Sequence, residues 1–154
     1  MTEYCTAGYR INACVKVMCP NERSTDCRQP LFIGSVSAGF PSPADDYIEG
    51  KLDLNEYLIK HPAATFFLRA AGDSMIEAGI HHGDILIVDR AIEPVDNNVV
   101  IAVVDGELTV KRIRKSENGL LLMPDNRDYE PIKVTEEMNV EIWGVVTNVI
   151  HSLY

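Results

Sequence analysis

The chain has 154 residues, of which 46% are hydrophobic and 24% charged, and its formal net charge is −9. This composition is ordinary for a globular protein, and no apolar run approaches the ~18 residues that a membrane span needs. There is also no charged segment followed by an apolar stretch, as a signal peptide would have, so the cytoplasm is the expected compartment.

The charge is distributed unevenly along the chain. Residues 1–38 hold four basic and three acidic side chains, whereas residues 39–154 hold ten basic and twenty acidic ones. An acidic body does not bind nucleic acid by neutralising phosphates. No direct nucleic-acid binding is therefore expected, and any role near DNA would require a protein partner.

All four cysteines lie in the first 27 residues, at Cys5, Cys14, Cys19 and Cys27. Their clustering could indicate zinc, but the spacing lacks the closely spaced cysteine pair that is usual in structural zinc sites. Disulfides are unexpected in the cytoplasm. We therefore expect free thiols in an extended, poorly ordered N-terminal arm.

Between this arm and the main body, residues 31–33 could form a short strand. Residues 34–46 read as a linker, since Pro41 and Pro43 exclude a central strand. Asp53, followed three residues later by a glutamate, is a capping box that opens a short helix. His61-Pro62 is expected to end that helix.

From Thr65 onward the pattern is that of short β-strands. Asp105-Gly106 separates two of them and predicts a tight hairpin. The expected strands cover residues 65–70, 84–89, 99–104, 107–113, 120–123 and 140–150. We predict a mostly β fold, a sandwich or partly open barrel with one short helix, in a domain over residues 50–154.

Two polar residues of this domain are candidates for chemistry. Ser74 follows a strand on a glycine-containing turn, where backbone N–H groups can converge on an oxyanion. Strand alternation places Lys111 on the same face as Ile113, and burial would lower its pKa toward that of a general base. Each also has a plainer interpretation, an ordinary turn serine and a snorkelling lysine.

A serine nucleophile requires a base, and histidine is the most frequent one. The four histidines are His61, His81, His82 and His151. Each lies beside a proline, in a glycine-rich turn or near the C-terminus, and His81-His82 resemble surface turn residues. Spacing does not exclude a Ser-His-Asp triad, but nothing in the sequence favours one.

Four motifs, in order and in register, resemble the UmuD/LexA family of self-cleaving serine peptidases over residues 39–150. They are GFPSPA at 39–44, GDSMI at 72–76, GDILIVD at 83–89 and VDGELTVK at 104–111. Each motif alone is weakly diagnostic, but their combination is specific.

The resemblance implies a Ser-Lys dyad, with Ser74 as nucleophile and Lys111 as general base, and no cofactor or metal. The backbone N–H groups of Asp73 and Ser74 would form the oxyanion hole. Cleavage would occur between Ala38 and Gly39, which removes residues 1–38 and leaves residues 39–49 as a linker. The small residues on both sides of this bond allow an extended chain to approach the nucleophile.

The resemblance also implies partners: a RecA filament on single-stranded DNA as coprotease and a UmuC-type translesion DNA polymerase. It implies a homodimer, for which residues 140–150, with Trp143 and Val145 on one face, are a candidate interface. Residues 1–38 are too short and too weakly basic for the DNA-binding domain of a repressor. Alternatives are a LexA-like or phage-type regulator without that domain, a non-cleaving interaction module, and a signal-peptidase-like enzyme, which would need a membrane anchor.

Overall fold

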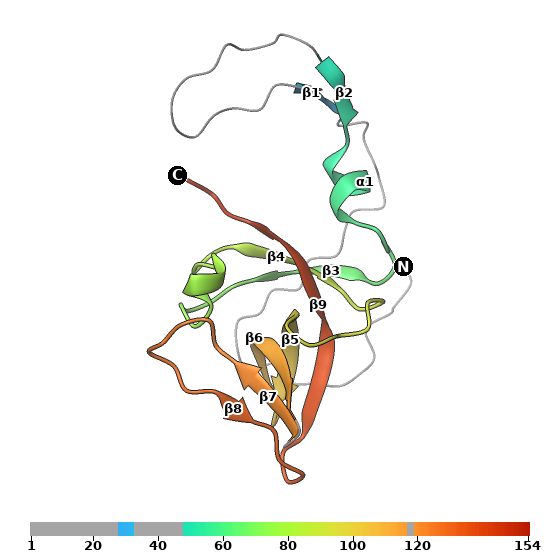
Figure 1. Ribbon diagram of the computed structural model, residues 1–154. Helices are drawn as coiled ribbons and strands as arrows, with labels where there is room; N and C mark the ends of the chain where they lie inside the picture. The colour runs from blue at the N-terminus through green and yellow to red at the C-terminus, as the bar shows by residue number, and fades with distance from the viewer. Residues whose placement is uncertain (1–27, 33–47, 117–118) are drawn as a thin grey trace. The chain divides into compact units, whose positions relative to one another are not determined.

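The computed structural model describes residues 28–32, 48–116 and 119–154, which belong to two compact units (Figure 1). In the smaller unit, β1 (Gln29–Phe32) pairs antiparallel with β2 (Ile48–Leu52), and the helix α1 (Leu54–Leu58) follows. The Asp53 carboxylate caps the helix by accepting the N–H of Asn55 at 2.8 Å, as the sequence predicts. The helix ends before the expected stop, because Ile59 already has an extended backbone.

The larger unit contains an antiparallel sheet of seven strands that does not close into a barrel. Its order is β3-β4-β9-β5-β6-β7-β8. The strands are β3 (Thr65–Arg69), β4 (Ile85–Asp89), β5 (Val99–Val104), β6 (Glu107–Ser116), β7 (Gly119–Met123), β8 (Ile132–Lys133) and β9 (Val140–Ile150). The predicted mostly β class with one short α-helix is thus confirmed.

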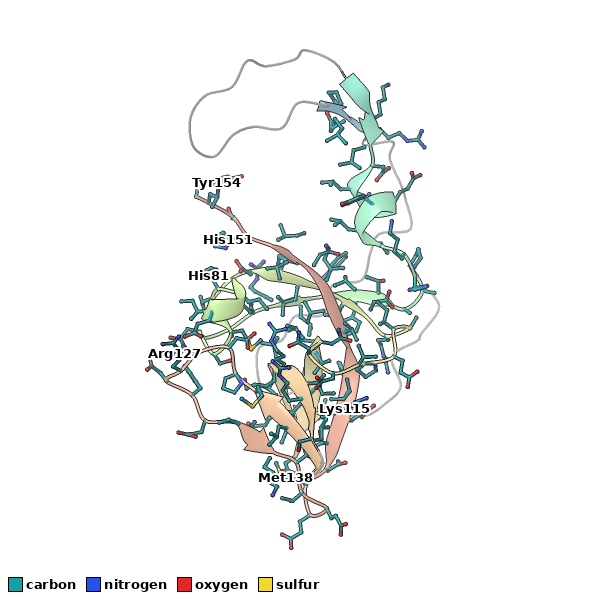
Figure 2. All side chains as sticks on the ribbon, in the orientation of Figure 1. His81, Lys115, Arg127, Met138, His151 and Tyr154 are labelled. Atoms are coloured by element: carbon teal, nitrogen blue, oxygen red, sulfur yellow. The ribbon has the colours of Figure 1, made fainter. Side chains whose placement is uncertain are left out.

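The strands of this sheet are joined by connections that range from a tight hairpin to longer loops. Asp105 and Gly106 both have positive φ and join β5 to β6 in the predicted hairpin, in which Val104 pairs with Glu107. A single 3₁₀ turn, η1 (Ile76–Ala78), follows β3. The longer loop between β7 and β8 carries Arg127, and the turn before β9 carries Met138 (Figure 2).

The long strand β9 joins the two halves of the sheet. Its first half pairs with β5 and its second half with β4, and Val145 pairs with both neighbours. Gly144 lies at this change of partner, where a Cβ atom would be 2.9 Å from both Asp89 O and Val88 Cγ1. A larger residue there would displace β4 from β9.

A β-bulge in β9 corrects one prediction. The register shifts between Ile101 and Ala102 of β5, which leaves Trp143 without a direct partner. Trp143 therefore packs edge-to-face on Phe66, with ring centroids 6.1 Å apart, while Val145 is buried in a different cluster. The expectation that Trp143 and Val145 share one face is wrong, and Val145, 5% exposed, belongs to the core.

Two apolar clusters fill the larger unit. The first contains Phe66, Leu68, Ala70, Met75, Ile80, Leu86, Val88 and Ile101, and the second contains Val100, Ala102, Ile113, Leu122 and Val145. Met75 is 1% exposed although it lies in a turn, and burial of such a side chain stabilises the fold by about 1.5–3 kcal/mol. This burial anchors the turn that carries Ser74.

Candidate active site

Ser74 lies on the turn that leads from β3 into η1. The base of the loop is closed by two backbone hydrogen bonds, from Ala70 N to Asp84 O at 2.8 Å and from Gly83 N to Ala70 O at 2.9 Å. Gly72 has φ +82°, a conformation that favours glycine and reverses the chain just before Ser74. The turn thus presents a partly exposed serine above a buried methionine.

Lys111 reaches this serine from the middle of β6. Its Nζ donates to Ser74 Oγ at 3.0 Å, to Thr109 Oγ1 at 2.9 Å and to the Val110 carbonyl at 2.9 Å. The residue is 8% exposed, and within the described part of the chain it forms no salt bridge. Burial lowers the pKa of Lys111 below its ordinary value, because a desolvated ammonium loses hydration that three neutral acceptors replace incompletely.

The backbone around Ser74 leaves donors available. In the described segments, the N–H groups of Asp73 and Ser74 donate no hydrogen bond, whereas the Asp73 carbonyl accepts the N–H of Ile76 at 3.1 Å. Free N–H groups beside a nucleophile can stabilise a developing oxyanion. Their assignment as the oxyanion hole stays a prediction.

A largely apolar pocket opens beside Ser74, between the end of β3 and the start of β6. It is lined by Leu68, Arg69, Ala70, Ala71, Ser74, Leu86, Ile101, Leu108, Thr109 and Val110. Such a pocket suits small apolar side chains of an extended peptide, whose main chain can then approach the serine.

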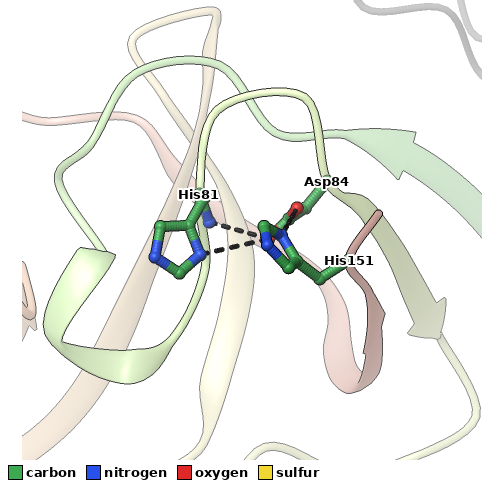
Figure 3. Close-up of side chains that lie close together, drawn as sticks. All are labelled: His81, Asp84 and His151. Carbon is green, nitrogen blue, oxygen red and sulfur yellow. Dashed lines mark hydrogen bonds and ion pairs between the residues drawn. The ribbon is translucent and has the colours of Figure 1, made fainter. Parts of the chain in front are cut away.

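The hydrogen bonds of the histidines go to residues other than Ser74. His61 Nδ1 lies 2.6 Å from Asp89 Oδ2, and His151 Nδ1 lies 2.6 Å from Asp84 Oδ1, next to His81 (Figure 3). His82 Nδ1 accepts the N–H of Gly72 at 3.2 Å. Among the described residues, no histidine makes a hydrogen bond to Ser74, in line with the lack of any sequence signal for a triad.

Asp84 is 3% exposed and remains ionised. Burial alone would raise its pKa, but the N–H of His81 and then the hydrogen bond and charge of His151 lower it more, so the net pKa lies below the usual range. The sequence indicated surface turn residues at His81-His82, and it did not connect them with His151.

The loop between β7 and β8 also holds the Ser74 turn, through residues other than Ser74 itself. Asp125 O accepts the N–H of Glu77 at 2.8 Å, and the Asp125 N–H lies 3.4 Å from Met75 Sδ. Asn126 Nδ2 donates to the Asp73 carbonyl at 3.0 Å, and the Tyr129 hydroxyl donates to the Asp73 carboxylate. These contacts fix the residues on both sides of Ser74.

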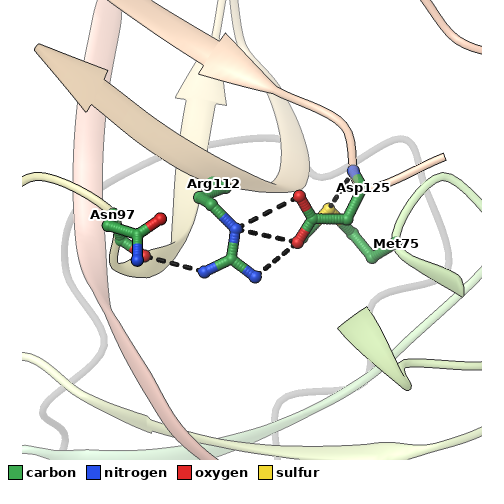
Figure 4. Close-up of polar contacts among 4 residues, drawn as sticks. All are labelled: Met75, Asn97, Arg112 and Asp125. Atoms are coloured by element: carbon green, nitrogen blue, oxygen red, sulfur yellow. Dashed lines mark hydrogen bonds and ion pairs between the residues drawn. The ribbon is translucent and has the colours of Figure 1, made fainter. Parts of the chain in front are cut away.

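Arg112 anchors that loop to the sheet (Figure 4). Its Nε lies 3.1 and 2.9 Å from the two carboxylate oxygens of Asp125, and its Nη2 also donates to that carboxylate. Its Nη1 donates to the Asn97 carbonyl at 2.8 Å. A guanidinium with this many directed contacts is a rigid support. Sequence reasoning missed it, since the Arg112–Asp125 pairing leaves no local pattern.

Similarity to known proteins identifies the family of this chain. Residues 30–147 match the Peptidase S24-like family model. The chain belongs to the Peptidase S24-like family. It is 48% identical over 136 residues to protein SamA of Salmonella typhimurium, a match that covers 88% of this chain and 94% of SamA.

Two further relatives of this S24-like chain cover 80% of it and 83% of their own length. Protein ImpA of Escherichia coli is 52% identical over 129 residues, and protein MucA of Escherichia coli is 45% identical over 126 residues. These homologues are UmuD-like, so the resemblance based on the four motifs is confirmed.

Several predicted features of this S24-like protein lie outside the described residues. These are the cleavage bond Ala38-Gly39 and the cysteines Cys5, Cys14, Cys19 and Cys27. In the described segments, no helix is both long and apolar enough to cross a membrane.

Proposed function

We propose that this peptidase cleaves its own Ala38-Gly39 bond, with Ser74 as nucleophile and Lys111 as general base. The observation that carries the proposal is the 3.0 Å contact between Lys111 Nζ and Ser74 Oγ, at a lysine that is 8% exposed. A lysine whose pKa is lowered by burial can exist as the neutral amine that takes up the serine proton.

The reaction proceeds in two steps. Neutral Lys111 accepts the Ser74 hydroxyl proton as Oγ attacks the Ala38 carbonyl carbon, and the N–H groups of Asp73 and Ser74 donate to the resulting oxyanion. The intermediate collapses, Lys111 returns the proton to the Gly39 nitrogen, and an ester joins Ser74 to Ala38. Water then hydrolyses this ester, with Lys111 again as base, and releases residues 1–38.

The pocket beside Ser74 supports a substrate of this kind. Its apolar lining and the small residues around Ala38-Gly39 fit an extended segment with short side chains. Pro41 and Pro43, close after the bond, lower the entropy cost of holding the segment extended. When the segment covers the site it excludes water, which further favours the neutral lysine.

We assign the protein, from its family, to the DNA-damage response. A RecA filament on single-stranded DNA stimulates the cleavage, and residues 39–154, as a homodimer, serve as accessory subunit of a UmuC-type translesion polymerase. The excess of acidic side chains in residues 39–154 supports recruitment through protein contacts rather than by direct DNA binding.

The test is incubation of the full chain with RecA, a nucleotide and single-stranded DNA, followed by intact mass measurement. We expect fragments 1–38 and 39–154, and without RecA the same fragments slowly at alkaline pH. Ser74→Ala should abolish both, whereas Ser152→Ala, at an exposed serine near the C-terminus, should cleave as the wild type does. A fragment that does not begin at Gly39, or cleavage by Ser74→Ala, would refute the proposal.

Light scattering on the trimmed protein tests the dimer separately. We expect a particle of twice the mass of residues 39–154 at micromolar concentration. A monomer at that concentration would contradict the homodimer while leaving the cleavage chemistry intact.

A further inference from the structure

A cluster outside the dyad combines two imidazoles and one buried carboxylate. His81 and Asp84 lie in the turn before β4, and His151 directly follows β9, so distant segments meet here (Figures 2 and 3). One ligand atom from each residue can be chosen so that all three lie within 4.8 Å of one another. The ring centroids of the two histidines are 4.8 Å apart.

An ordinary ion pair explains only part of this arrangement. Asp84 Oδ1 lies 2.6 Å from His151 Nδ1, and Asp84 Oδ2 accepts the backbone N–H of His81 at 2.7 Å. His81 Nδ1 is different. It is buried and has no hydrogen-bond partner among the residues that the structure describes, and its distance to Asp84 Oδ2 is 3.8 Å. A buried ring nitrogen that faces a carboxylate without a bond is a costly arrangement unless something else satisfies it.

We propose that His81, Asp84 and His151 bind a divalent transition-metal ion, with Zn²⁺ as the reference ion. Two imidazoles and a carboxylate form a donor set that suits Zn²⁺ and Ni²⁺, and a water molecule completes the tetrahedron around zinc. The ion gives His81 Nδ1 the partner that it lacks.

Small rotations of the two histidine rings are needed to bring the three ligand atoms to the distances of a zinc site. Zinc bonds of ~2.0–2.1 Å place tetrahedral ligand atoms ~3.4 Å apart. Asp84 is held in place, with its side chain 3% exposed, whereas the His81 and His151 side chains are 44% and 43% exposed. Rotation of these two rings brings their nitrogens around the fixed carboxylate.

Such an ion would connect the end of β9 to the base of the loop that carries Ser74. Asp84 contributes to that base through its carbonyl, which accepts the N–H of Ala70 at 2.8 Å. The site is separate from the dyad, because none of its three side chains makes a hydrogen bond to Ser74 or Lys111 in the described part of the chain. The role of the bound ion is to stabilise the loop that carries Ser74.

The chain offers a matched control in the other histidine–aspartate pair. His61 Nδ1 lies 2.6 Å from Asp89 Oδ2, and the Asp89 side chain is 4% exposed. That pair reproduces the distance and the buried carboxylate of the His151–Asp84 pair, but the three-residue cluster does not include it. His61→Gln should therefore leave metal binding unchanged.

The experiment is calorimetric titration of the full chain with ZnCl₂ and, separately, NiCl₂. The four cysteines are replaced by serine so that thiolates do not compete. We expect one ion per chain. His81→Gln and His151→Gln should each weaken binding at least ~10-fold, since even partners outside the ligand shell contribute ~10–100-fold. At a Zn²⁺ concentration that just saturates the parent, the Tm should rise for the parent and for His61→Gln, and by clearly less for His151→Gln.

Equal binding by His61→Gln, His81→Gln and His151→Gln would overturn the proposal, as would absence of binding in the cysteine-free parent. His151 follows the last strand and is exposed, so His151→Gln decides the result even if His81→Gln fails to fold. Circular dichroism of each variant verifies the fold.

Discussion

Lys111 and Arg112 are neighbours on β6, and their side chains leave opposite faces of the strand into different surroundings. Lys111 meets three neutral oxygen acceptors. Arg112 meets the carboxylate of Asp125 and the carbonyl of Asn97. Lys111 thus contacts the serine turn directly, whereas Arg112 is connected to it only through Asp125 of the β7–β8 loop.

The difference lies in the charge of the partners. A carboxylate beside Lys111 would stabilise the ammonium and raise its pKa, whereas neutral acceptors and burial lower it. Arginine does not lose its proton under any ordinary condition, so a carboxylate partner makes it a permanent support. The first environment suits a group that must exchange a proton, and the second suits a group that must not move.

The largest expected effect comes from Lys111→Arg, which keeps the charge and removes the base. The guanidinium cannot accept the Ser74 proton, so self-cleavage should fall by at least ~100-fold at every pH. Cleavage followed by mass measurement checks this. Lys115→Arg, at an exposed lysine of the same strand, is the matched control and should cleave normally. Substantial cleavage by Lys111→Arg at alkaline pH would refute the base assignment.

The four-motif resemblance predicted that Lys111 pairs with Ser74, whereas strand alternation along β6 alone left a snorkelling lysine as an alternative. Neither the motifs nor the alternation predicted the contacts of Arg112. Asp125 and Tyr129 lie in a polar loop without a period, and their contacts with Arg112 and Asp73 join distant parts of the chain. Local patterns carry no information about such pairs.

The bulge in β9 was missed although the sequence holds one signal for it. Strict alternation puts Trp143 and Val145 on one face, and an extra residue in the strand reverses that relation; Gly144 between them is the kind of strand glycine that often marks a bulge. The registers of β4 and β5, which both pair with β9, determine where the bulge occurs.

The second prediction concerns the Arg112 side. Arg112→Ala should release Asp125 and loosen the turn at Met75 and Glu77, so cleavage should slow by ~10–100-fold, as expected for a small displacement of the nucleophile. The pH dependence should keep its midpoint, because Lys111 is unaltered. Arg114→Ala, whose arginine is exposed and lies 3.7 Å from Asp96, is the matched control. A shifted midpoint would show that Arg112 acts on Lys111 instead.

The third prediction tests the cost of a buried lysine. The pKa of Lys111 is lower in the fold than its ordinary 10.5. Between the lowered pKa of the folded state and pH 10.5, the folded protein therefore binds fewer protons than the unfolded chain. The contribution of Lys111 to stability is complete above about pH 10.5 and is lost as pH falls through the folded pKa. Lys111→Met should thus raise the free energy of unfolding at pH 7, by about 0.5–2 kcal/mol.

This gain should shrink as pH rises toward the ordinary lysine pKa. Urea unfolding at several pH values measures it, and Lys115→Met, which replaces an exposed lysine, should show no comparable gain. A Lys111→Met variant that is less stable than wild type at pH 7 would mean that the three hydrogen bonds outweigh the desolvation of the ammonium.

The smallest expected effect is that of Tyr129→Phe, which removes one exposed contact of the loop. The hydroxyl donates to the Asp73 carboxylate, and this hydrogen bond, together with the negative charge of Asp73, raises the pKa of Tyr129 above its ordinary 10.0. Because the folded pKa is raised, the contact is fully present below about pH 10 and is lost only as pH rises through the folded value. This contact between Tyr129 and Asp73 therefore persists up to about pH 10.

Tyr129→Phe should accordingly lower the cleavage rate by a nearly constant factor of ~2–3 up to about pH 10, and the two rates should converge at higher pH. Rates of self-cleavage without coprotease, measured between pH 7 and pH 11, provide the comparison. Asn126 still donates to the Asp73 carbonyl in this variant, which keeps the loss small. A loss that grows with pH instead would mean that the phenol takes part in proton transfer, and Lys111 would then not be the sole base.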